Sequence, residues 1–151
     1  MFQIFYQVNE DLFKDTFSDI NFESILSESI PKMESLLKIK EKHFSIILTD
    51  DEFIKSINNM YRNKNYPTDV ISFPSGDDSI ELVDNENDLG ELYISIETAI
   101  RQAAAFNVAV ENELKRLIVH GILHLMGFDH ERSAKDEALM TEQENFVLER
   151  V

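Results

Sequence analysis

His120-Gly-Ile-Leu-His124-Leu-Met-Gly127-Phe-Asp-His130 decides the fold of this chain, because three of its four histidines lie within these eleven residues. Residues four apart on a helix share one face, so His120 and His124 can direct two ring nitrogens to one point. Gly127 is a residue type at which a helix can end and the chain reverse, which returns His130 to the pair. Three imidazole nitrogens suit a tetrahedral Zn²⁺ site that keeps a fourth position for water or substrate. The stretch therefore predicts a metal helix with an open, catalytic type of site.

The residues around the histidines support this interpretation. An apolar stripe runs along the predicted helix, with His120 and His124 at its edge, so we expect both rings to be half buried. Asp129 precedes His130 and is a candidate to orient a ligand through a second hydrogen bond. Nickel and iron also accept imidazole, and zinc is preferred on geometry and availability. The stripe consists of Val110, Leu114, Leu117, Ile118, Gly121, Ile122 and Leu125.

The spacing His-x-x-x-His-x-x-Gly-x-x-His resembles that of the metzincin metallopeptidases. In those proteins a glutamate after the first histidine is the general base, whereas this chain has Gly121 there. Peptide hydrolysis would therefore need another carboxylate at the metal. The acids considered for that role are Glu91, Glu111, Glu113, Glu142 and Glu144. Met140 is predicted to be an ordinary core methionine rather than a residue beneath the metal.

Three blocks of the sequence resemble one family more closely. Val119 to His130 is similar to the signature of the YbeY family of bacterial metal-dependent endoribonucleases. Asn59-Met-Tyr-Arg62, followed by Pro67-Thr-Asp-Val-Ile-Ser-Phe-Pro74, resembles a second block of that family. Leu89-Gly-Glu-Leu-Tyr-Ile-Ser95 resembles a third block, with Glu91 where Asp is usual. The three blocks follow one another in the family's order.

The resemblance implies a zinc-dependent, single-strand-specific endoribonuclease. It would act in ribosomal RNA maturation, at the 3′ end of the small-subunit RNA, and in ribosome quality control. The implied metal ligands are His120, His124 and His130, and the implied catalytic residues are Arg62, His120 and His124. A guanidinium such as that of Arg62 stays charged and can bind a phosphate through two N–H groups. The implied partners are ribosomal RNA, the small ribosomal subunit, ribosomal proteins and an assembly GTPase.

Two other classes of function stay open at this point. One is a non-enzymatic ribosome assembly factor whose metal is structural, which predicts a closed fourth position. The other is a metallopeptidase-like hydrolase, which predicts an acid beside the metal in place of the missing glutamate. The identity of the native metal is also open. So is the group that attacks the phosphodiester, which is either water or the 2′-hydroxyl of the RNA.

The net charge is the main argument against an RNA substrate. The chain has 29 acidic and 14 basic residues, a net charge of −15, which disfavours non-specific binding to a polyanion. Residues 76–88 hold six of the acids and no Lys or Arg, so a predicted loop carries much of this charge. We expect free RNA to bind weakly and a partner to position it. Two groups of cations are candidates for local positive rims, Lys55, Arg62 and Lys64 in one and Arg101, Lys115 and Arg116 in the other.

The remaining patterns predict an α+β fold in a single domain, residues 1–151. Hydrophobic periodicity predicts strands at 2–8, 44–48, 70–73 and 89–96 and helices at 22–37, 50–62, 97–106, 109–126 and 134–148. We expect a mixed sheet of about four strands packed with about five helices, and a metzincin-like metal helix in the core.

Local signals refine these elements. Pro31 is expected to kink or split its helix. Thr49-Asp-Asp-Glu52 is read as a capping box, and Ser133 is predicted to cap the last helix. The chain has no cysteine, so metal ligands must be nitrogen or oxygen. Its start has no basic region or long apolar run, which favours a cytoplasmic protein without a membrane segment.

Overall fold

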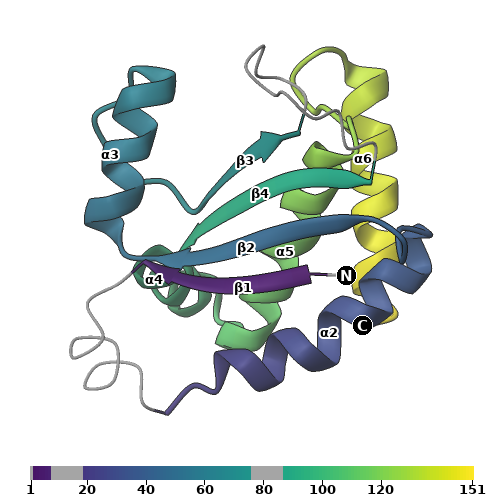
Figure 1. The fold of residues 1–151 in the computed structure, drawn as a ribbon, viewed down its shortest axis with the longest axis horizontal. Coiled ribbons are helices and arrows are strands. Elements are labelled where there is room, and N and C mark those ends of the chain that lie inside the picture. Colours follow the sequence, from purple (N-terminus) through teal and green to yellow (C-terminus); the bar gives the residue numbers. More distant parts are fainter. Residues whose placement is uncertain (1, 8–18, 76–86) are drawn as a thin grey trace.

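One mixed sheet organises the protein (Figure 1). The computed structural model describes residues 2–7, 19–75 and 87–151. The strand order is β1-β2-β4-β3, with β1, β2 and β4 parallel and β3 antiparallel to β4. The predicted α+β fold is thereby confirmed, with four strands and five helices in the described residues. The elements are β1 (Phe2–Gln7), α2 (Phe22–Leu37), β2 (His43–Thr49), α3 (Asp51–Arg62), β3 (Val70–Pro74), β4 (Asp88–Ser95), α4 (Ile96–Phe106), α5 (Val110–Leu125) and α6 (Ala134–Leu148).

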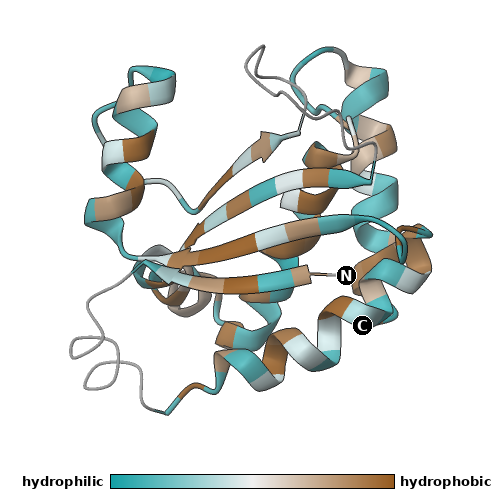
Figure 2. Cartoon of the chain, in the orientation of Figure 1, coloured by the Kyte–Doolittle hydropathy of each residue, from teal (hydrophilic) through white to brown (hydrophobic). Residues whose placement is uncertain are grey.

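The main core lies between one face of the sheet and the helices around α5. Alternate residues of the strands, such as Ile46 and Leu92, are fully buried against this layer. Hydrophobic residues are accordingly concentrated on the inner strands and on α5 (Figure 2). Val119 and Leu123 are also buried, so the apolar surface of α5 is wider than the predicted stripe. The reason is that α5 contacts β3 and β4 on one side and α4 and α6 on others. The helix that carries two of the histidines is therefore held on several sides.

A smaller core places α3 on the opposite face of the sheet. Ile54 and Ile57 of α3 pack with Ile71 of β3, next to Phe73 and other aromatic residues. Because side chains alternate along a strand, Ile71 and Phe73 face away from the layer of α5. In Figure 1, α3 accordingly stands apart from the other helices. Strand β3 thus lies between α3, which ends at Arg62, and the metal helix α5.

The start of α3 differs by one residue from the predicted capping box. The N-cap is Asp50, whose side chain accepts a hydrogen bond from Phe53 N at 2.8 Å. Thr49 is instead the last residue of β2, fully buried, and its hydroxyl donates to the Ile94 carbonyl at 3.2 Å. Both residues are good caps, and the pairing of β2 with β4 keeps Thr49 in the strand. Asp51 then fixes the helix to α4, because its carboxylate accepts from Ser95 and Thr98 at 2.6 Å.

Two other local predictions had different outcomes. Pro31 does not split its helix, since α2 runs unbroken from Phe22 to Leu37. Ile30 and Met33, on either side of the proline, are fully buried, and this packing holds the helix together. Ser133 does cap α6, as predicted, by accepting from Asp136 N at 3.1 Å. Val8, the last residue of the first predicted strand, and most of the predicted acidic loop lie outside the described residues. Within the described residues, no helix is both long and apolar enough to span a membrane.

Candidate metal centre

The end of α5 brings the three histidines together, as the sequence predicted. His120 and His124 are one turn apart on α5, and the helix ends at Leu125. Gly127 follows with φ +101°, a left-handed conformation that favours glycine. Phe128 N then donates to the Leu123 carbonyl at 3.0 Å, which closes the helix end. This turn carries His130 back beside the first two rings.

The distances between the rings fit one metal ion. Nε2 of His120 and Nε2 of His124 are 3.2 Å apart. Two nitrogens at tetrahedral positions about 2.0–2.1 Å from Zn²⁺ are separated by about 3.3–3.4 Å. The His130 ring centroid lies 5.3 Å from that of His120 and 5.1 Å from that of His124. One nitrogen of each ring falls within 4.8 Å of the others, and no further His, Asp or Glu of the described chain joins this group. Three ligands leave an open coordination position.

The contact of His120 with Glu144 leaves a bare ring nitrogen facing His124. Nδ1 of His120 lies 2.6 Å from Oε1 of Glu144, and since a carboxylate accepts, this contact favours the ring proton on Nδ1. Nε2 of His120 then has a free lone pair that faces Nε2 of His124 at 3.2 Å. Imidazole nitrogens at this separation are donors that one metal ion can bind. The donor set therefore fits a metal ion.

His130 and the pKa of His124 support the same conclusion. Nδ1 of His130 is buried and has no hydrogen-bond partner among the described residues. An unpaired buried polar atom costs about 1–3 kcal/mol, which a ligand at the site would offset. Burial lowers the pKa of His124, and the neighbouring His120 and His130 lower it further. The His124 ring is thus held in the neutral form that a metal requires.

Arg62 lies at the same pocket as the histidines. The pocket is lined by residues from two of the three sequence blocks that resemble the family, among them Arg62, Ser72, His120, His124 and His130, but by none from residues 89–95. Arg62 is the last residue of α3 and is exposed, and no ion pair of Arg62 is found in the described part of the chain. Asn58, four residues earlier, is buried and donates to the Tyr66 carbonyl at 2.9 Å, which fixes the loop after the helix. The guanidinium is therefore free to meet an anion in the pocket.

The carboxylate that contacts a histidine of the site is Glu144, not the predicted Asp129. Asp129 accepts a hydrogen bond from Glu131 N at 2.8 Å and lies 3.5 Å from the Arg132 guanidinium. Among the described residues, the Asp129 carboxylate therefore forms no hydrogen bond with the adjacent His130 ring. Glu144 of α6 instead contacts His120, at a separation of 24 residues. The sequence offered Glu144 only as one of several acids, because no local pattern places α6 against α5.

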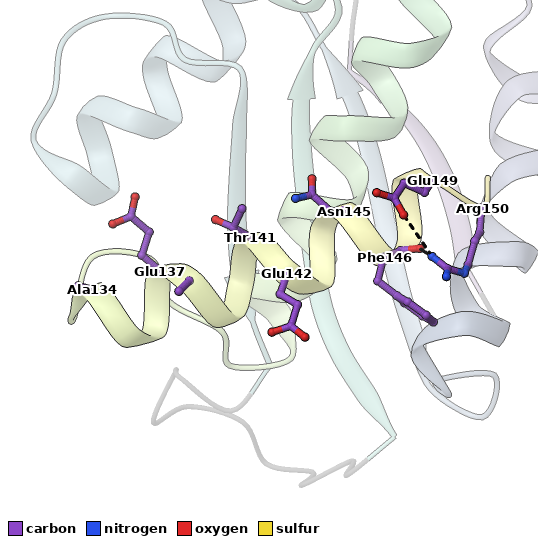
Figure 3. A pocket seen from close by; sticks show the side chains of 9 residues that line it. Ala134, Glu137, Thr141, Glu142, Asn145, Phe146, Glu149 and Arg150 are labelled. Atoms are coloured by element: carbon purple, nitrogen blue, oxygen red, sulfur yellow. Dashed lines mark hydrogen bonds and ion pairs between the residues drawn. The ribbon is translucent and has the colours of Figure 1, made fainter.

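The other acids considered as a general base do not join the group of three histidines. Glu113 is buried and paired with Arg116, and Glu111 pairs with Lys115. Glu91 accepts from the Tyr93 hydroxyl, on the groove beside α3. Glu142 lines a separate hollow on the outer face of α6 (Figure 3), where Arg150 covers the ring of Phe146 and the described lining has no histidine. Met140 is a core residue, 1% exposed, as predicted.

Gly121 shows why a metzincin-like glutamate has no place here. A Cβ added to Gly121 would lie 2.7 Å from Cδ2 of Leu92, a fully buried residue of β4. A side chain at this position would thus point into the core between α5 and the sheet, not towards the metal. The general base of a metzincin therefore cannot be restored at residue 121 without disturbing the fold.

One of the two predicted positive rims is wrong. Arg101 pairs with Asp51 at 2.7 Å, Lys115 with Glu111, and Arg116 with Glu113, so these cations are neutralised by acids of the fold. In the other group, Arg62 and Lys64 both line the metal pocket, whereas Lys55 does not contribute to its lining.

Comparison with known proteins agrees with this geometry. The family model described as endoribonuclease YbeY matches residues 7–151. The chain belongs to the YbeY family. An "Endoribonuclease YbeY" of Aquifex aeolicus is 44% identical over 117 residues, 78% of this chain and 75% of that protein. One of Caldicellulosiruptor saccharolyticus is 36% identical over 152 residues, 95% of this chain and 89% of that protein. The solution structure of a Thermotoga maritima protein matches with a TM-score of 0.66 at 29% identity, and covers 99% of this chain and 87% of that one.

Proposed function

We propose that this protein is a zinc-dependent endoribonuclease that cleaves single-stranded RNA. The observation that carries the proposal is the convergence of three imidazoles and the Arg62 guanidinium on one pocket, with no ion pair of Arg62 in the described part of the chain. The names of the relatives in the YbeY family support the same activity. We further propose that the enzyme acts in the cytoplasm, in maturation of the 3′ end of the small-subunit ribosomal RNA and in ribosome quality control.

The residues of the pocket divide the chemical work between them. His120, His124 and His130 would hold the ion, and the preference of a three-nitrogen, open site is for Zn²⁺, with Ni²⁺ as the other candidate. A metal bound there would supply Lewis acidity for a phosphoryl oxygen and would lower the pKa of bound water towards the neutral range. Arg62 binds the phosphate and stabilises the negative charge that builds up as the phosphodiester is attacked.

The edge of β3 favours a nucleic acid over a peptide strand. Ser95 N donates to Asp69 O, and Ser75 N donates to Leu89 O. In this antiparallel pair the odd-numbered residues of β3 therefore direct their backbone N–H and C=O groups towards β4. Val70, Ser72 and Pro74 therefore direct their backbone groups outwards, and all three line the metal pocket. The Asp69 carboxylate takes the Val70 N–H at 2.7 Å, and proline has none.

Ser72 N–H is thus the one outward donor of this edge within Val70–Pro74. A peptide strand needs a row of donors and acceptors to pair with an edge, and this edge offers almost only acceptors. The single Ser72 N–H, in the same pocket as Arg62, suits one phosphate oxygen instead. Together with the buried position of Gly121, this argues against the metallopeptidase alternative.

The charge of the protein indicates how the substrate arrives. The protein has a net charge of −15, and the cations that line the pocket are Arg62, Lys64 and Arg132. Arg132 lies within 4 Å of the carboxylates of Asp129 and Asp136, which offset its charge. We propose that the small ribosomal subunit, through ribosomal proteins or an assembly GTPase, positions the RNA and replaces the missing electrostatic attraction.

The test is cleavage of single-stranded RNA and of small ribosomal subunits by zinc-loaded protein, with sequencing of the RNA ends. We expect His124→Ala and chelated protein to lose cleavage, and Arg62→Ala to lose about 10²–10³-fold in rate, the usual effect of removing one charge-stabilising donor. Lys55→Ala, which removes an exposed cation of the same helix outside the pocket, is the matched control and should cleave normally.

Other outcomes separate the alternatives. A 2′,3′-cyclic phosphate at the new ends would identify the 2′-hydroxyl, rather than water, as the attacking group. If wild-type protein cleaves no more RNA than the His124→Ala protein in either substrate, the nuclease proposal fails and a non-enzymatic assembly factor becomes the better explanation.

A further inference from the structure

We infer that Glu144 is a positioning residue of the metal centre, which holds the His120 ring so that its Nε2 lone pair faces the ion. The inference rests on the metal site of the proposed function, but not on the reaction performed there. It assigns to α6 a direct part in metal binding.

The contact itself is short and comes from a separate element. Oε1 of Glu144 lies 2.6 Å from Nδ1 of His120, at the lower end of the range for charge-assisted hydrogen bonds. Both side chains are mostly buried, with 26% of His120 and 21% of Glu144 exposed. The bond therefore experiences less competition from water than an exposed ion pair.

The consequence for His120 follows from the chemistry of a neutral imidazole. The ring has one N–H and one bare nitrogen, and only the bare nitrogen can bind a metal. A carboxylate at Nδ1 places the proton there and leaves Nε2, 3.2 Å from the Nε2 of His124, as the ligand. Without this acceptor the proton can occupy Nε2 and the ring can rotate, so part of the population cannot bind the ion.

Arg116 is a fixed cation near the contact. The Arg116 side chain is held by Glu113, through its Nε at 3.1 Å and its terminal nitrogen at 2.5 Å. Glu113 is 2% exposed and also accepts from Gln102 at 2.9 Å, which fixes the geometry of the pair. Arg116 interacts electrostatically with Glu144 as well as with Asp69. The carboxylate of Glu144 thus lies in surroundings that include a fixed positive charge.

The three ligands are supported unequally, which makes the inference specific to His120. The hydrogen bond found for the His124 ring among the described residues is with His120, not with a carboxylate. His130, whose side chain is 40% exposed, has Glu131 at 3.8 Å from its Nε2, and that acid is itself 84% exposed. Among the described residues around the site, only His120 is bound by a mostly buried carboxylate. Carboxylates in this position raise the basicity of a metal-bound histidine, and their loss typically weakens metal binding about 10–100-fold.

The experiment measures zinc affinity by competition with a chromophoric chelator, and the protonation of His120 by ¹⁵N NMR of the metal-free protein. Glu144→Met removes the acceptor at similar volume, and Glu144→Gln removes the charge but retains an acceptor oxygen. Glu142→Gln and Glu142→Met are the matched controls, because Glu142 lies two residues away on the outer face of α6 and lines the other hollow (Figure 3). Thermal unfolding of each metal-free variant shows whether it is folded.

We expect Glu144→Met to bind zinc at least tenfold more weakly, with a loss of the Nδ1–H form of His120. Glu144→Gln should retain that form and lose less affinity, and both Glu142 variants should bind within twofold of wild type. A loss of less than tenfold in Glu144→Met, or the same loss in Glu142→Met, overturns the inference. If Glu144→Met does not fold, Glu144→Ala, which also removes the acceptor, is judged by the same tenfold criterion. Because the readout is metal binding, a failure of RNA cleavage would refute the nuclease and leave this result intact.

Discussion

Replacement of Gly121 by alanine tests how α5 is held against the sheet. Gly121 follows His120, is buried, and leaves room for Leu92 of β4. The added Cβ would lie 2.7 Å from Cδ2 and 3.1 Å from Cδ1 of Leu92, well below ordinary contact distances. Since Leu92 is fully buried, its end cannot turn away freely. Either α5 moves from β4 or Leu92 adopts a strained conformation.

Two effects of opposite sign set the magnitude. Overpacking of a core costs about 1–3 kcal/mol. Alanine is favoured over glycine in a helix by about 0.8–1.0 kcal/mol. We therefore expect Gly121→Ala to lower the free energy of unfolding by about 0–2 kcal/mol. In a Leu92→Val background the two δ-carbons are gone, the clash is relieved, and the same replacement should be neutral or stabilising by up to about 1 kcal/mol.

The assay is urea unfolding of four proteins: wild type, Gly121→Ala, Leu92→Val and the double variant. Metal is removed first, so that binding does not contribute to stability. The expected coupling between the two sites is about 1–3 kcal/mol, within the range for residues in contact. If Gly121→Ala has the same effect in both backgrounds, within about 0.5 kcal/mol, the close approach of α5 to β4 does not explain the glycine. A zinc affinity unchanged by Gly121→Ala would further show that the helix has not moved.

Three further predictions concern the surroundings of the pocket. Burial alone would raise the pKa of Asp51, but hydrogen bonds from Ser95, Thr98 and Arg101 outweigh it and lower the pKa. Asp51→Asn should therefore cost about 1–3 kcal/mol at neutral pH in urea unfolding. The difference should begin to shrink as the pH falls through about 4, where a free Asp titrates, and disappear only below the lowered pKa of the folded carboxylate. Ser72→Pro, which removes the outward N–H of an edge strand, should slow RNA cleavage about 10–100-fold, whereas Ser72→Ala should not; equal rates would exclude that N–H as a phosphate donor. Zinc at a hundred times its dissociation constant should stabilise wild type by about 2.7 kcal/mol in a thermal melt and His124→Ala by much less; equal stabilisation would place the ion elsewhere.

The parts of the site that follow from local rules could be predicted from the sequence. His120 and His124 share a helix face because they are four residues apart, and Gly127 reverses the chain in a left-handed conformation. Strand and helix positions followed from hydrophobic periodicity to within one or two residues. These features depend on the nearest turn of chain and on little else.

The parts that depend on packing between distant elements could not be predicted. Glu144 reaches His120 only because α6 lies against α5, whereas Asp129, the neighbour in sequence, is taken up by Glu131 and Arg132. The pairing of Arg101 with Asp51 joins α4 to α3 and has no local signal. The pairs of Lys115 with Glu111 and of Arg116 with Glu113 are different, because a local signal for them was present in the sequence. The acids lie four and three residues before their partners on the same helix, α5.

The central claim, that three histidines hold one metal ion required for RNA cleavage, is tested most directly by a single titration. Metal-free protein is given increasing zinc, and bound metal and the rate of RNA cleavage are measured on the same samples. We predict that the rate rises in proportion to occupancy and reaches its plateau at one ion per chain. Cleavage that is independent of occupancy, or a His124→Ala protein that binds one ion with unchanged affinity and cleaves at the same rate, would contradict the claim.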